Sequence, residues 1–485
     1  MNRLRHSLRH SLALGVLTLL APAALAAGLP ASVQQALKAS GLPAEALHVS
    51  LLPLDGGRPA HIRADEAVSP ASTMKLVTTW AGLNLLGPAW QWQTDILAEQ
   101  KPVNGVLDGE LYLRGSGDPK LTIERMWLLV RELRAAGVDD IRGRLVLDGS
   151  VFGPLALPQD YEDDGDTERA FLVQPDALLS NFRTLRITID STGERVQIQT
   201  EPPLNQVRVS NDLALGEAGD CANWSKRIQQ RAGQVTGVHW LVQFVGEMPR
   251  GCRAVRYVPA LTPRDYTAAL FWYLWYAEGG KGSGHSLKPE GRAVPEAAQI
   301  LASTRSPDVT AIVRDINKFS NNVMARQLFL TLGSHQAGGS ATGTPTDIAA
   351  QEAVRGWLTS EGLDWPELVI ENGSGLSRRE RISTRHLADL LRQAWRSPLA
   401  AEFVSSLPLV GLDGTMKKRL TQPGEAGLAH LKTGSLRDVR AIAGYVRDDK
   451  GKNWALVGII NHAEAPRGVP VLDALTRSVL RGEWR

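Results

Sequence analysis

The residues Ser72-Thr73-Met74-Lys75 say most about the architecture and chemistry of this chain of 485 residues. Residues three apart lie on one face of a helix, so a helix here places the Lys75 amine beside the Ser72 hydroxyl. Serine is a weak nucleophile near neutral pH and needs a base within hydrogen-bond reach. Burial would lower the pKa of the lysine toward the range in which its neutral amine can be that base. The motif therefore predicts a serine nucleophile, although alone it also fits an ordinary helix start capped by Ser72.

Two further polar motifs follow along the chain. Ser320-Asn321-Asn322 lies within a stretch whose pattern predicts helix, and it also fits a polar helix start or a turn. Lys432-Thr433-Gly434-Ser435 lies on a predicted strand, where Gly434 leaves room for a close-approaching backbone. The Lys432 amine could attract a substrate carboxylate, and the alternative is an exposed strand end. Three motifs in this order are much stronger evidence than any one of them.

Extended segments occur at both ends of the chain. Leu47 to Leu54 reads as a strand that a turn joins to a second extended segment near His61. His430 to Thr433, Arg440 to Arg447 and Trp454 to Asn461 are three more. We expect one antiparallel sheet with helices packed on it, interrupted by a long insertion. Helices are predicted at Ser72 to Leu86, Thr122 to Ala136, Pro307 to Thr331, Ser383 to Trp395 and Val471 to Leu480.

The pattern of residues changes near residue 93, where short predicted strands and turns begin. We expect a discontinuous catalytic domain of residues 27–92 and 297–485, interrupted by a β-rich region of residues 93–296. That region is expected to hold two nested domains, the inner one covering about 180–258. Cys221 and Cys252 are the two cysteines, and in an oxidising compartment their simplest fate is one disulfide. The alternative is two unrelated buried thiols.

The N-terminus has the layout of a secretory signal. Arg3, Arg5 and Arg9 precede the apolar run Leu12 to Leu20, which leads into Ala24-Leu25-Ala26. The apolar run is too short to span a bilayer, which argues against a membrane anchor. We expect residues 1–26 to be a signal peptide, and the mature protein to be exported to the periplasm with at most peripheral membrane association.

Composition excludes several other classes of function. The net charge is +3, and the Lys and Arg residues are scattered among acids, so nucleic acid is not an expected partner. The Cys and His residues do not have the spacing of a zinc site, and we expect neither a metal nor a cofactor. The Gly-x-Ser-x-Gly pattern of α/β-hydrolases is missing from the sequence.

The three motifs, S-x-x-K, S-x-N and K-T-G, form the signature set of class A β-lactamases and penicillin-binding proteins. The chain resembles the low-molecular-mass class C penicillin-binding proteins of the D-Ala-D-Ala carboxypeptidase/endopeptidase type, which carry a large insertion in the catalytic domain. The 248 positions between Ser72 and Ser320 fit such an insertion. Other stretches similar to that family are Gly115 to Pro119, Leu147 to Phe152, Glu371 to Leu376 and Val410 to Met416. The resemblance implies an α+β fold: a β-lactamase/transpeptidase-like domain with a large inserted β-rich region.

The resemblance also implies an activity. A member of this family is a serine DD-peptidase that cleaves D-Ala-D-Ala termini, D-Ala-meso-diaminopimelate cross-links, or both, in the stem peptides of peptidoglycan. Penicillins and other β-lactams acylate its serine. In this chain the family implies Ser72 as the nucleophile, Lys75 as the base and Ser320 as a proton relay.

Substrate-binding roles are implied in the same way. Asn322 would orient the substrate, Lys432 and Thr433 would lie near its terminal carboxylate, and Gly434 would leave room for the close approach. The backbone amides of Ser72 and Ser435 would form the oxyanion hole.

Asp148 is a candidate contact to an amine of the stem peptide, although an Asp-Gly turn at a strand end is the alternative. Two other functions remain open. A β-lactamase would need a second base for deacylation, which we do not identify, and Asn321 departs from the S-D-N form of class A enzymes. An exported scaffold that binds peptidoglycan without activity would not need all three motifs intact.

Overall fold

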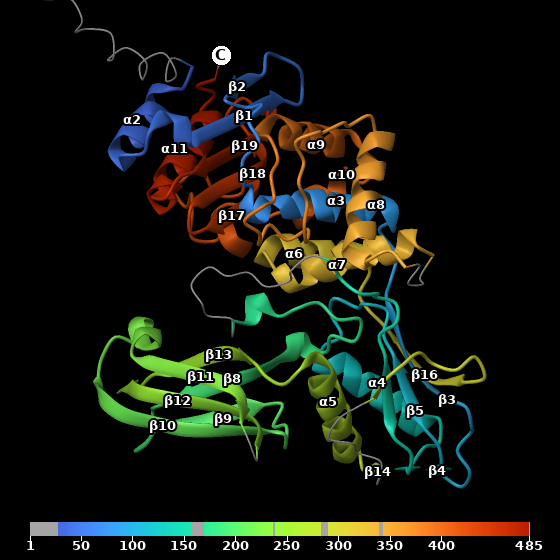
Figure 1. Cartoon of the computed structure of the whole chain (residues 1–485). Helices are drawn as coiled ribbons and strands as arrows, with labels where there is room; N and C mark the ends of the chain where they lie inside the picture. The colour runs from blue at the N-terminus through green and yellow to red at the C-terminus, as the bar shows by residue number, and fades with distance from the viewer. Residues whose placement is uncertain (1–27, 157–168, 236–237, 283–289, 339–342, 485) are drawn as a thin grey trace, which may run out of the picture.

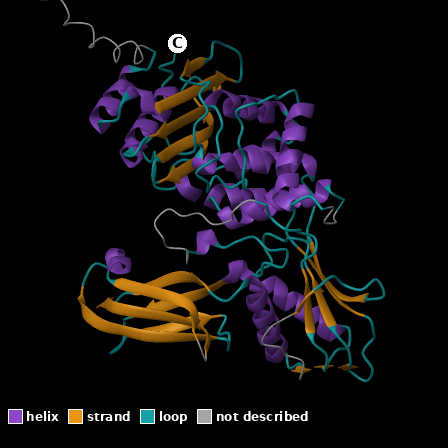
Figure 2. Cartoon of the chain, in the orientation of Figure 1, coloured by secondary structure: helices purple, strands orange, loops and turns teal. Residues whose placement is uncertain are grey.

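The computed structural model describes residues 28–156, 169–235, 238–282, 290–338 and 343–484 (Figure 1). The predicted signal peptide, residues 1–26, lies outside the described residues. Figure 2 shows a part in which helices surround a sheet, and below it a region in which most of the strands of the insertion lie. Among the described residues, no helix combines the length and apolarity needed to cross a membrane.

The first sheet joins the two ends of the chain. Its strands are β1 (Leu47–Pro53), β2 (Ala60–Ile62), β17 (Ala429–Leu436), β18 (Val439–Arg447) and β19 (Asn453–Asn461). They are antiparallel in the order β17-β18-β19-β1-β2, so β17 is an edge strand. This confirms the sheet that the sequence predicts from two early and three late extended segments.

Helices cover both faces of this sheet (Figure 1). Successive side chains of a strand point to opposite faces, so a strand buried on both sides reads as a continuous apolar run. In β18, Ala441, Ala443 and Tyr445 belong to one core, while Ile442 and Val446 belong to the other. The second core is closed by α2 (Ala31–Ser40) and α11 (Val469–Leu480). The first core is closed by α3 (Lys75–Leu85), α6 (Val309–Phe319), α7 (Asn322–Gln336), α8 (Thr346–Ser360), α9 (Thr384–Arg396) and α10 (Ala400–Ser406).

The predicted helix from Pro307 to Thr331 is wrong as one continuous element. The structure divides it into α6 and α7 at Ser320, whose φ of 55° and ψ of 37° are left-handed. An L-residue enters that region at a cost of about 1–2 kcal/mol, so the chain cannot continue as one helix there. The side chain of Asn321 accepts the Met324 N–H and caps the new helix.

The inserted region contains one mixed sheet next to the helical part. Its strands, in sheet order, are β15 (Glu290–Gly291), β7 (Leu145–Asp148), β5 (Leu111–Arg114), β3 (Gln93–Ala98) and β16 (Gln299–Arg305). Strand β16 pairs with β3, so the two ends of the insertion lie side by side and the sheet continues past residue 297. The division of the chain into domains stays a prediction. The helices α4 (Ile123–Ala135) and α5 (Pro263–Ala277) and the short strands β4 (Val106–Leu107), β6 (Asp140–Ile141) and β14 (Lys281–Gly282) complete this lobe.

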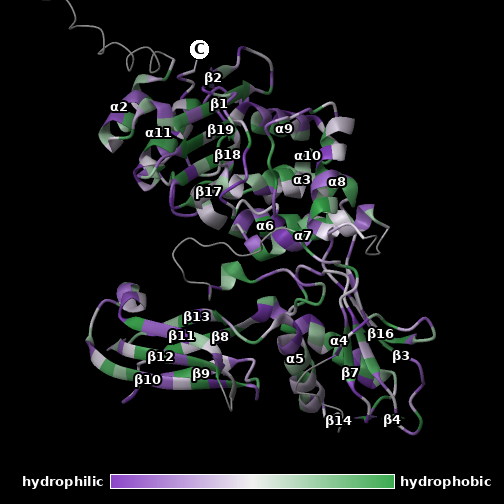
Figure 3. Cartoon of the chain, in the orientation of Figure 1, coloured by the Kyte–Doolittle hydropathy of each residue, from purple (hydrophilic) through white to green (hydrophobic). Residues whose placement is uncertain are grey.

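The remaining strands form two three-stranded sheets at the other side of the insertion (Figure 1). One has the order β13-β8-β9 and is antiparallel, with β8 (Thr184–Asp190), β9 (Gln197–Glu201) and β13 (Arg253–Pro259). The other has the order β10-β12-β11. Hydrophilic and hydrophobic residues mix along these strands in Figure 3, as expected for sheets with one solvent-exposed face. The strands of the second sheet are β10 (Val207–Ala218), β11 (Ile228–Val235) and β12 (Val238–Arg250).

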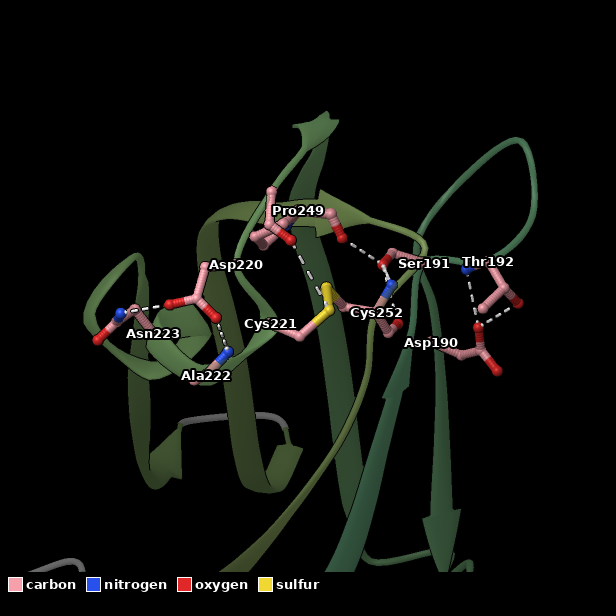
Figure 4. Close-up of a disulfide and its surroundings, with 10 residues drawn as sticks. Asp190, Ser191, Thr192, Asp220, Cys221, Ala222, Asn223, Pro249 and Cys252 are labelled. Carbon is pink, nitrogen blue, oxygen red and sulfur yellow. Dashed lines mark hydrogen bonds between the residues drawn. A yellow bond between two sulfur atoms is a disulfide. The ribbon is translucent and has the colours of Figure 1, made fainter.

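Cys221 and Cys252 form the predicted disulfide, which confirms that expectation (Figure 4). It joins the segment after β10 to the start of β13 and closes a loop with a sequence separation of 31. The buried Ser191 hydroxyl supports it by donating to the Pro249 and Cys252 carbonyl oxygens at 2.6 and 2.9 Å. The bridge therefore ties together the two sheets of this lobe.

Candidate active site

The nucleophile candidate lies on a short 3-10 turn, Ala71–Met74, that runs directly into α3. The Lys75 side chain is fully buried, and its Nζ donates to Ser72 Oγ at 2.9 Å. The same amine donates to Asn322 Oδ1 at 2.6 Å and to the Ser374 carbonyl oxygen. Residues that are three apart thus meet as the sequence predicts, and two distant segments hold the amine in place.

Burial lowers the pKa of Lys75 to about 7, and the carboxylate of Glu380 partly opposes this by raising it. Desolvation disfavours the charged form of an amine, which is the physical cause of the shift. The neutral form of Lys75 is therefore accessible near neutral pH, so this amine can accept a proton from Ser72.

A second buried amine comes from the edge strand β17. Lys432 Nζ donates to Ser320 Oγ at 2.8 Å and to the Thr433 carbonyl oxygen at 2.7 Å. Burial lowers the pKa of Lys432 well below its usual value, and the charge of Lys75 lowers it further. Ser320 and Asn322 flank the break between α6 and α7, so this break directs one side chain to each amine. Two amines and two hydroxyls from three distant motifs meet at one place.

Strand β17 packs closely against the turn that carries Ser72. A Cβ at Gly434 would lie 2.8 Å from the Pro70 carbonyl oxygen and 3.2 Å from the Ala71 Cβ. Glycine is needed there because two backbones approach each other too closely for a side chain. The predicted role of Gly434 in leaving room therefore has a direct geometric basis.

The outer edge of β17 is only partly covered. The Leu431 N–H donates to the Pro408 carbonyl oxygen, and the Val410 N–H donates to the Ala429 carbonyl oxygen. Backbone groups alternate between the two sides of an antiparallel strand, so the Thr433 and Ser435 N–H groups also point to this edge. Ser435 is exposed, and its amide is therefore placed at the open edge beside the Ser72 turn.

Comparison with known proteins agrees with this meeting of three motifs around Ser72. The model of the D-Ala-D-Ala carboxypeptidase 3 (S13) family matches residues 29–478. The chain belongs to this family. It is 30% identical over 429 residues to the D-alanyl-D-alanine carboxypeptidase of an Actinomadura species, an alignment that covers 84% of this chain and 76% of the relative. It is 26% identical over 408 residues to the D-alanyl-D-alanine carboxypeptidase DacB of Haemophilus influenzae, covering 81% and 80%.

The fold is also that of a solved relative. Penicillin binding protein 4 of Haemophilus influenzae superposes with a TM-score of 0.75 at 23% identity, over 93% of this chain and 99% of that one. A complex of the same protein with a β-lactam superposes with a TM-score of 0.72. The predicted α+β fold, a β-lactamase/transpeptidase-like domain with a large inserted β-rich region, is confirmed, and this S13 family member is a serine-type D-Ala-D-Ala carboxypeptidase.

The structure adds one acidic residue that sequence reasoning missed. Glu380 is fully buried, and its Oε1 accepts the N–H groups of Glu371, Asn372 and Gly373 at 3.0, 3.0 and 3.2 Å. Burial raises the pKa of Glu380 to about 7, and the amides of Asn372 and Gly373 together with the charge of Lys75 oppose the shift. In the sequence it lies among Arg378, Arg379 and Arg381, a pattern typical of a solvated surface. The sequence therefore predicted an exposed charge at this position, and none of the three motifs pointed to it.

Glu380 organises the loop 371–375, whose carbonyl groups hold α3. The Ser374 carbonyl oxygen accepts from Lys75 Nζ, and the Gly373 carbonyl oxygen accepts from Thr78 Oγ1 at 2.6 Å. Gly375, with a φ of 77°, packs its Cα against the Ala71 and Ser72 backbone. The loop therefore supports both the lysine and the turn of the nucleophile.

Asp148 lies in the inserted sheet of this S13 family member, at the end of β7, and is 3% exposed. Its Oδ1 accepts the Ser150 N–H and its Oδ2 accepts the Val294 N–H, both at 2.9 Å. These bonds hold a turn and the returning chain together, as the strand-end alternative implied. The predicted contact between Asp148 and the stem peptide stays a prediction, and this geometry gives it no support.

Proposed function

We propose that this chain hydrolyses the bond after a D-alanine in peptidoglycan stem peptides through an acyl-enzyme on Ser72. One observation carries the proposal: the bonds from Lys75 to Ser72 and Asn322, beside the bond from Lys432 to Ser320. A hydroxyl next to a buried amine with a lowered pKa is the arrangement that an activated serine nucleophile needs.

In acylation, the neutral Lys75 amine accepts the Ser72 proton while Ser72 Oγ attacks the D-alanine carbonyl carbon. The negative charge that develops on the carbonyl oxygen is stabilised by the N–H groups of Ser72 and Ser435. A donor of this kind is worth about 3–4 kcal/mol of barrier in other serine enzymes. The left-handed turn at Ser320 and the close packing at Gly434 support this geometry, because they fix the groups around the carbonyl.

The tetrahedral intermediate then collapses, and the bond between the carbonyl carbon and the leaving nitrogen breaks. Ser320 gives its proton to the leaving amine and is reprotonated through Lys432, to which it is hydrogen-bonded. Protonated Lys75 gives up the proton that it took from Ser72, which replaces the one lost by the Ser320–Lys432 pair. Its neutral amine can then accept a proton from the water that attacks the acyl-enzyme, and this proton passes to Ser72 Oγ as the acyl bond breaks. Asn322 bonds to Lys75 through its carbonyl oxygen, so its amide nitrogen is directed away from that amine, where it can orient the substrate.

Lys432 and Thr433 are proposed to bind the terminal carboxylate of the substrate. The Thr433 hydroxyl is hydrogen-bonded to the Thr415 hydroxyl at 2.9 Å and is partly exposed. A carboxylate next to the buried Lys432 would raise the pKa of that amine again, which couples its protonation to substrate binding. Binding of the substrate carboxylate would thus favour the protonated, charged form of Lys432.

We further propose that the protein works in the periplasm on both uncross-linked and cross-linked stem peptides. The predicted signal sequence and the disulfide support export, since disulfides persist in oxidising compartments. Both substrates present a D-alanine carbonyl to the same hydroxyl, so one nucleophile suffices for the carboxypeptidase and the endopeptidase reaction.

Fluorescent penicillin labelling tests the assignment directly. The purified protein should become covalently labelled and should release D-alanine from a muropeptide that ends in D-Ala-D-Ala. Ser72→Ala should lose both properties while it keeps the thermal unfolding midpoint of the original chain. A folded, unmodified protein that is neither labelled nor active would contradict the proposal, and rapid turnover of the penicillin would favour a β-lactamase instead.

A further inference from the structure

A cavity of about 780 Å³ opens beside the catalytic break between α6 and α7. One wall contains Phe319 to Val323, and so includes Ser320 and Asn322. The opposite wall belongs to the β13-β8-β9 sheet of the insertion, and the sides are formed by the start of α4 and by the turn Ala170–Leu172. Small-molecule sites commonly have volumes of about 300–1,000 Å³. The cavity therefore connects Ser320 and Asn322 with a lobe to which the mechanism assigns no role.

The insertion's wall presents a row of side chains in register. Tyr257 of β13 pairs with Arg186 of β8, and Arg186 pairs with Glu201 of β9. Directly opposed residues on neighbouring strands project from the same face of a sheet. All three line the cavity and are solvent-exposed. Arg186 and Glu201 lie side by side, so their charges offset each other.

Exposed aromatic rings gather around this cavity. Among the described residues, the exposed aromatic side chains are Phe171, Tyr257, Tyr276 and Phe319, at 43%, 56%, 43% and 66% exposure. Three of these four, all except Tyr276, line this cavity. Burial normally removes such rings from water, so their convergence in one concave place marks a site for a ligand.

The lining combines aromatic faces with neutral amides and hydroxyls. A sugar ring offers the complement: an apolar C–H face for aromatic packing, with hydroxyl and acetamido groups around its rim for hydrogen bonds. A strongly anionic ligand fits less well, because the lining holds two carboxylates, Glu124 and Glu201, against the single cation Arg186. The remaining polar residues of the lining are Thr122, Glu124, Asn181, Thr184, Ser320, Asn321 and Asn322.

We propose that this cavity binds sugar rings of the peptidoglycan glycan strand whose stem peptide is being cleaved. The inference rests on the proposed function, because that substrate carries its peptide and its sugars on one covalent framework. Sugars held between the β13-β8-β9 sheet and Phe319 would bring the attached peptide to Ser320 and Asn322. The insertion would then select glycan-linked peptides over free peptides.

Two substrates that differ only in the sugars test this proposal. One is the pentapeptide ending in D-Ala-D-Ala, and the other is the same peptide on a disaccharide of N-acetylglucosamine and N-acetylmuramic acid. We expect the unmodified enzyme to have a kcat/KM for the sugar-linked peptide at least about tenfold higher, by D-alanine release. Tyr257→Ala and Arg186→Ala should bring this ratio close to one.

Val255→Ala is the matched control. Val255 lies two residues before Tyr257 on the same strand and the same face, is 41% exposed, and does not line the cavity. It should keep the ratio of the unmodified enzyme. A ratio near one for the unmodified enzyme, or a ratio unchanged by Tyr257→Ala and Arg186→Ala, would overturn the inference.

A third substrate separates sugar from peptide binding. If cleavage of a sugar-free, cross-linked peptide dimer depends on Tyr257 as strongly as cleavage of the sugar-linked peptide, the cavity takes a second stem peptide and the glycan proposal is wrong. Failure of the proposed function looks different, because then none of the three substrates is cleaved and Ser72 is not labelled by penicillin. Binding of the peptide-free disaccharide by calorimetry, weakened at least about tenfold in Tyr257→Ala, provides a readout that does not need turnover.

Discussion

Replacing Gly375 by alanine would put a methyl group into the backbone of the nucleophile's turn. The new Cβ would lie 2.8 Å from the Ser72 amide nitrogen and closer still to the Ala71 carbonyl oxygen. Relaxing the first contact to about 3.5 Å requires a shift of roughly 0.7 Å, and the second contact requires more. A misplacement of about 1 Å at reacting groups can reduce the rate about 100-fold.

We therefore expect Gly375→Ala to slow acylation of Ser72 by fluorescent penicillin about 100-fold. The φ of 77° at Gly375 adds a cost of about 1–2 kcal/mol in stability, because an alanine disfavours this region. The second-order rate constant of labelling, measured at several penicillin concentrations, separates slow acylation from a loss of folded protein. Circular dichroism and the thermal midpoint check the fraction that is folded.

Gly362→Ala is the control for the backbone cost alone. Its φ is 74°, and a Cβ there has open space within 4 Å. Gly362→Ala should lose only the stability that the backbone conformation costs and should be labelled at the unmodified rate, whereas Gly375→Ala should lose more stability and be labelled slowly. If folded Gly375→Ala is labelled as fast as Gly362→Ala, the loop 371–375 does not fix the position of Ser72.

Three further outcomes are expected. Protonated Lys75 cannot accept the Ser72 proton, so the acylation rate should rise with pH up to about 7 and should fall roughly tenfold for each pH unit below it. An acylation rate that does not change from pH 5 to 8 would contradict this. Glu380→Gln removes a charge that raises the pKa of Lys75, so the acidic side of the acylation rate profile should move to lower pH. If Glu380 had only a structural role, the substitution would lower the acylation rate without moving this part of the profile. Cys221→Ser opens a loop with a separation of 31 and should lower the free energy of unfolding of its lobe by about 4 kcal/mol in urea titrations, with unchanged penicillin labelling of folded protein.

The main features of the site were accessible from the sequence because each depends on local spacing. Ser72 and Lys75 meet because they are three apart on a helical turn, and Gly434 is needed where a strand touches that turn. The five-stranded sheet followed from alternating and continuous apolar runs at the two ends of the chain. The count of two cysteines, together with the expected export, predicted the Cys221–Cys252 bridge.

Other features depend on tertiary context and could not be predicted. A polar helix start or turn at Ser320 was one of two interpretations of the sequence, but the left-handed conformation of Ser320 and its bond to Lys432, 112 positions away, could not be predicted from it. Glu380 resembles a solvated charge in the sequence, yet it is fully buried because three backbone amides bind its carboxylate. The row of Tyr257, Arg186 and Glu201 needs the register of three strands, which no single segment encodes.

The pairing of β1 with β19 has a consequence for biogenesis. Leu47 lies opposite Ile460, so the earliest strand can pair with β2 at once, but it gains its second neighbour, β19, only after almost the whole polypeptide has been made. Contacts this distant along the chain form late, because a long loop must first close. The insertion can fold while the first sheet is still incomplete, and the serine should become reactive last. A chain shortened by its final 30 or so residues would lack part of β19 and all of α11, and would be expected to leave a folded insertion attached to an inert remainder.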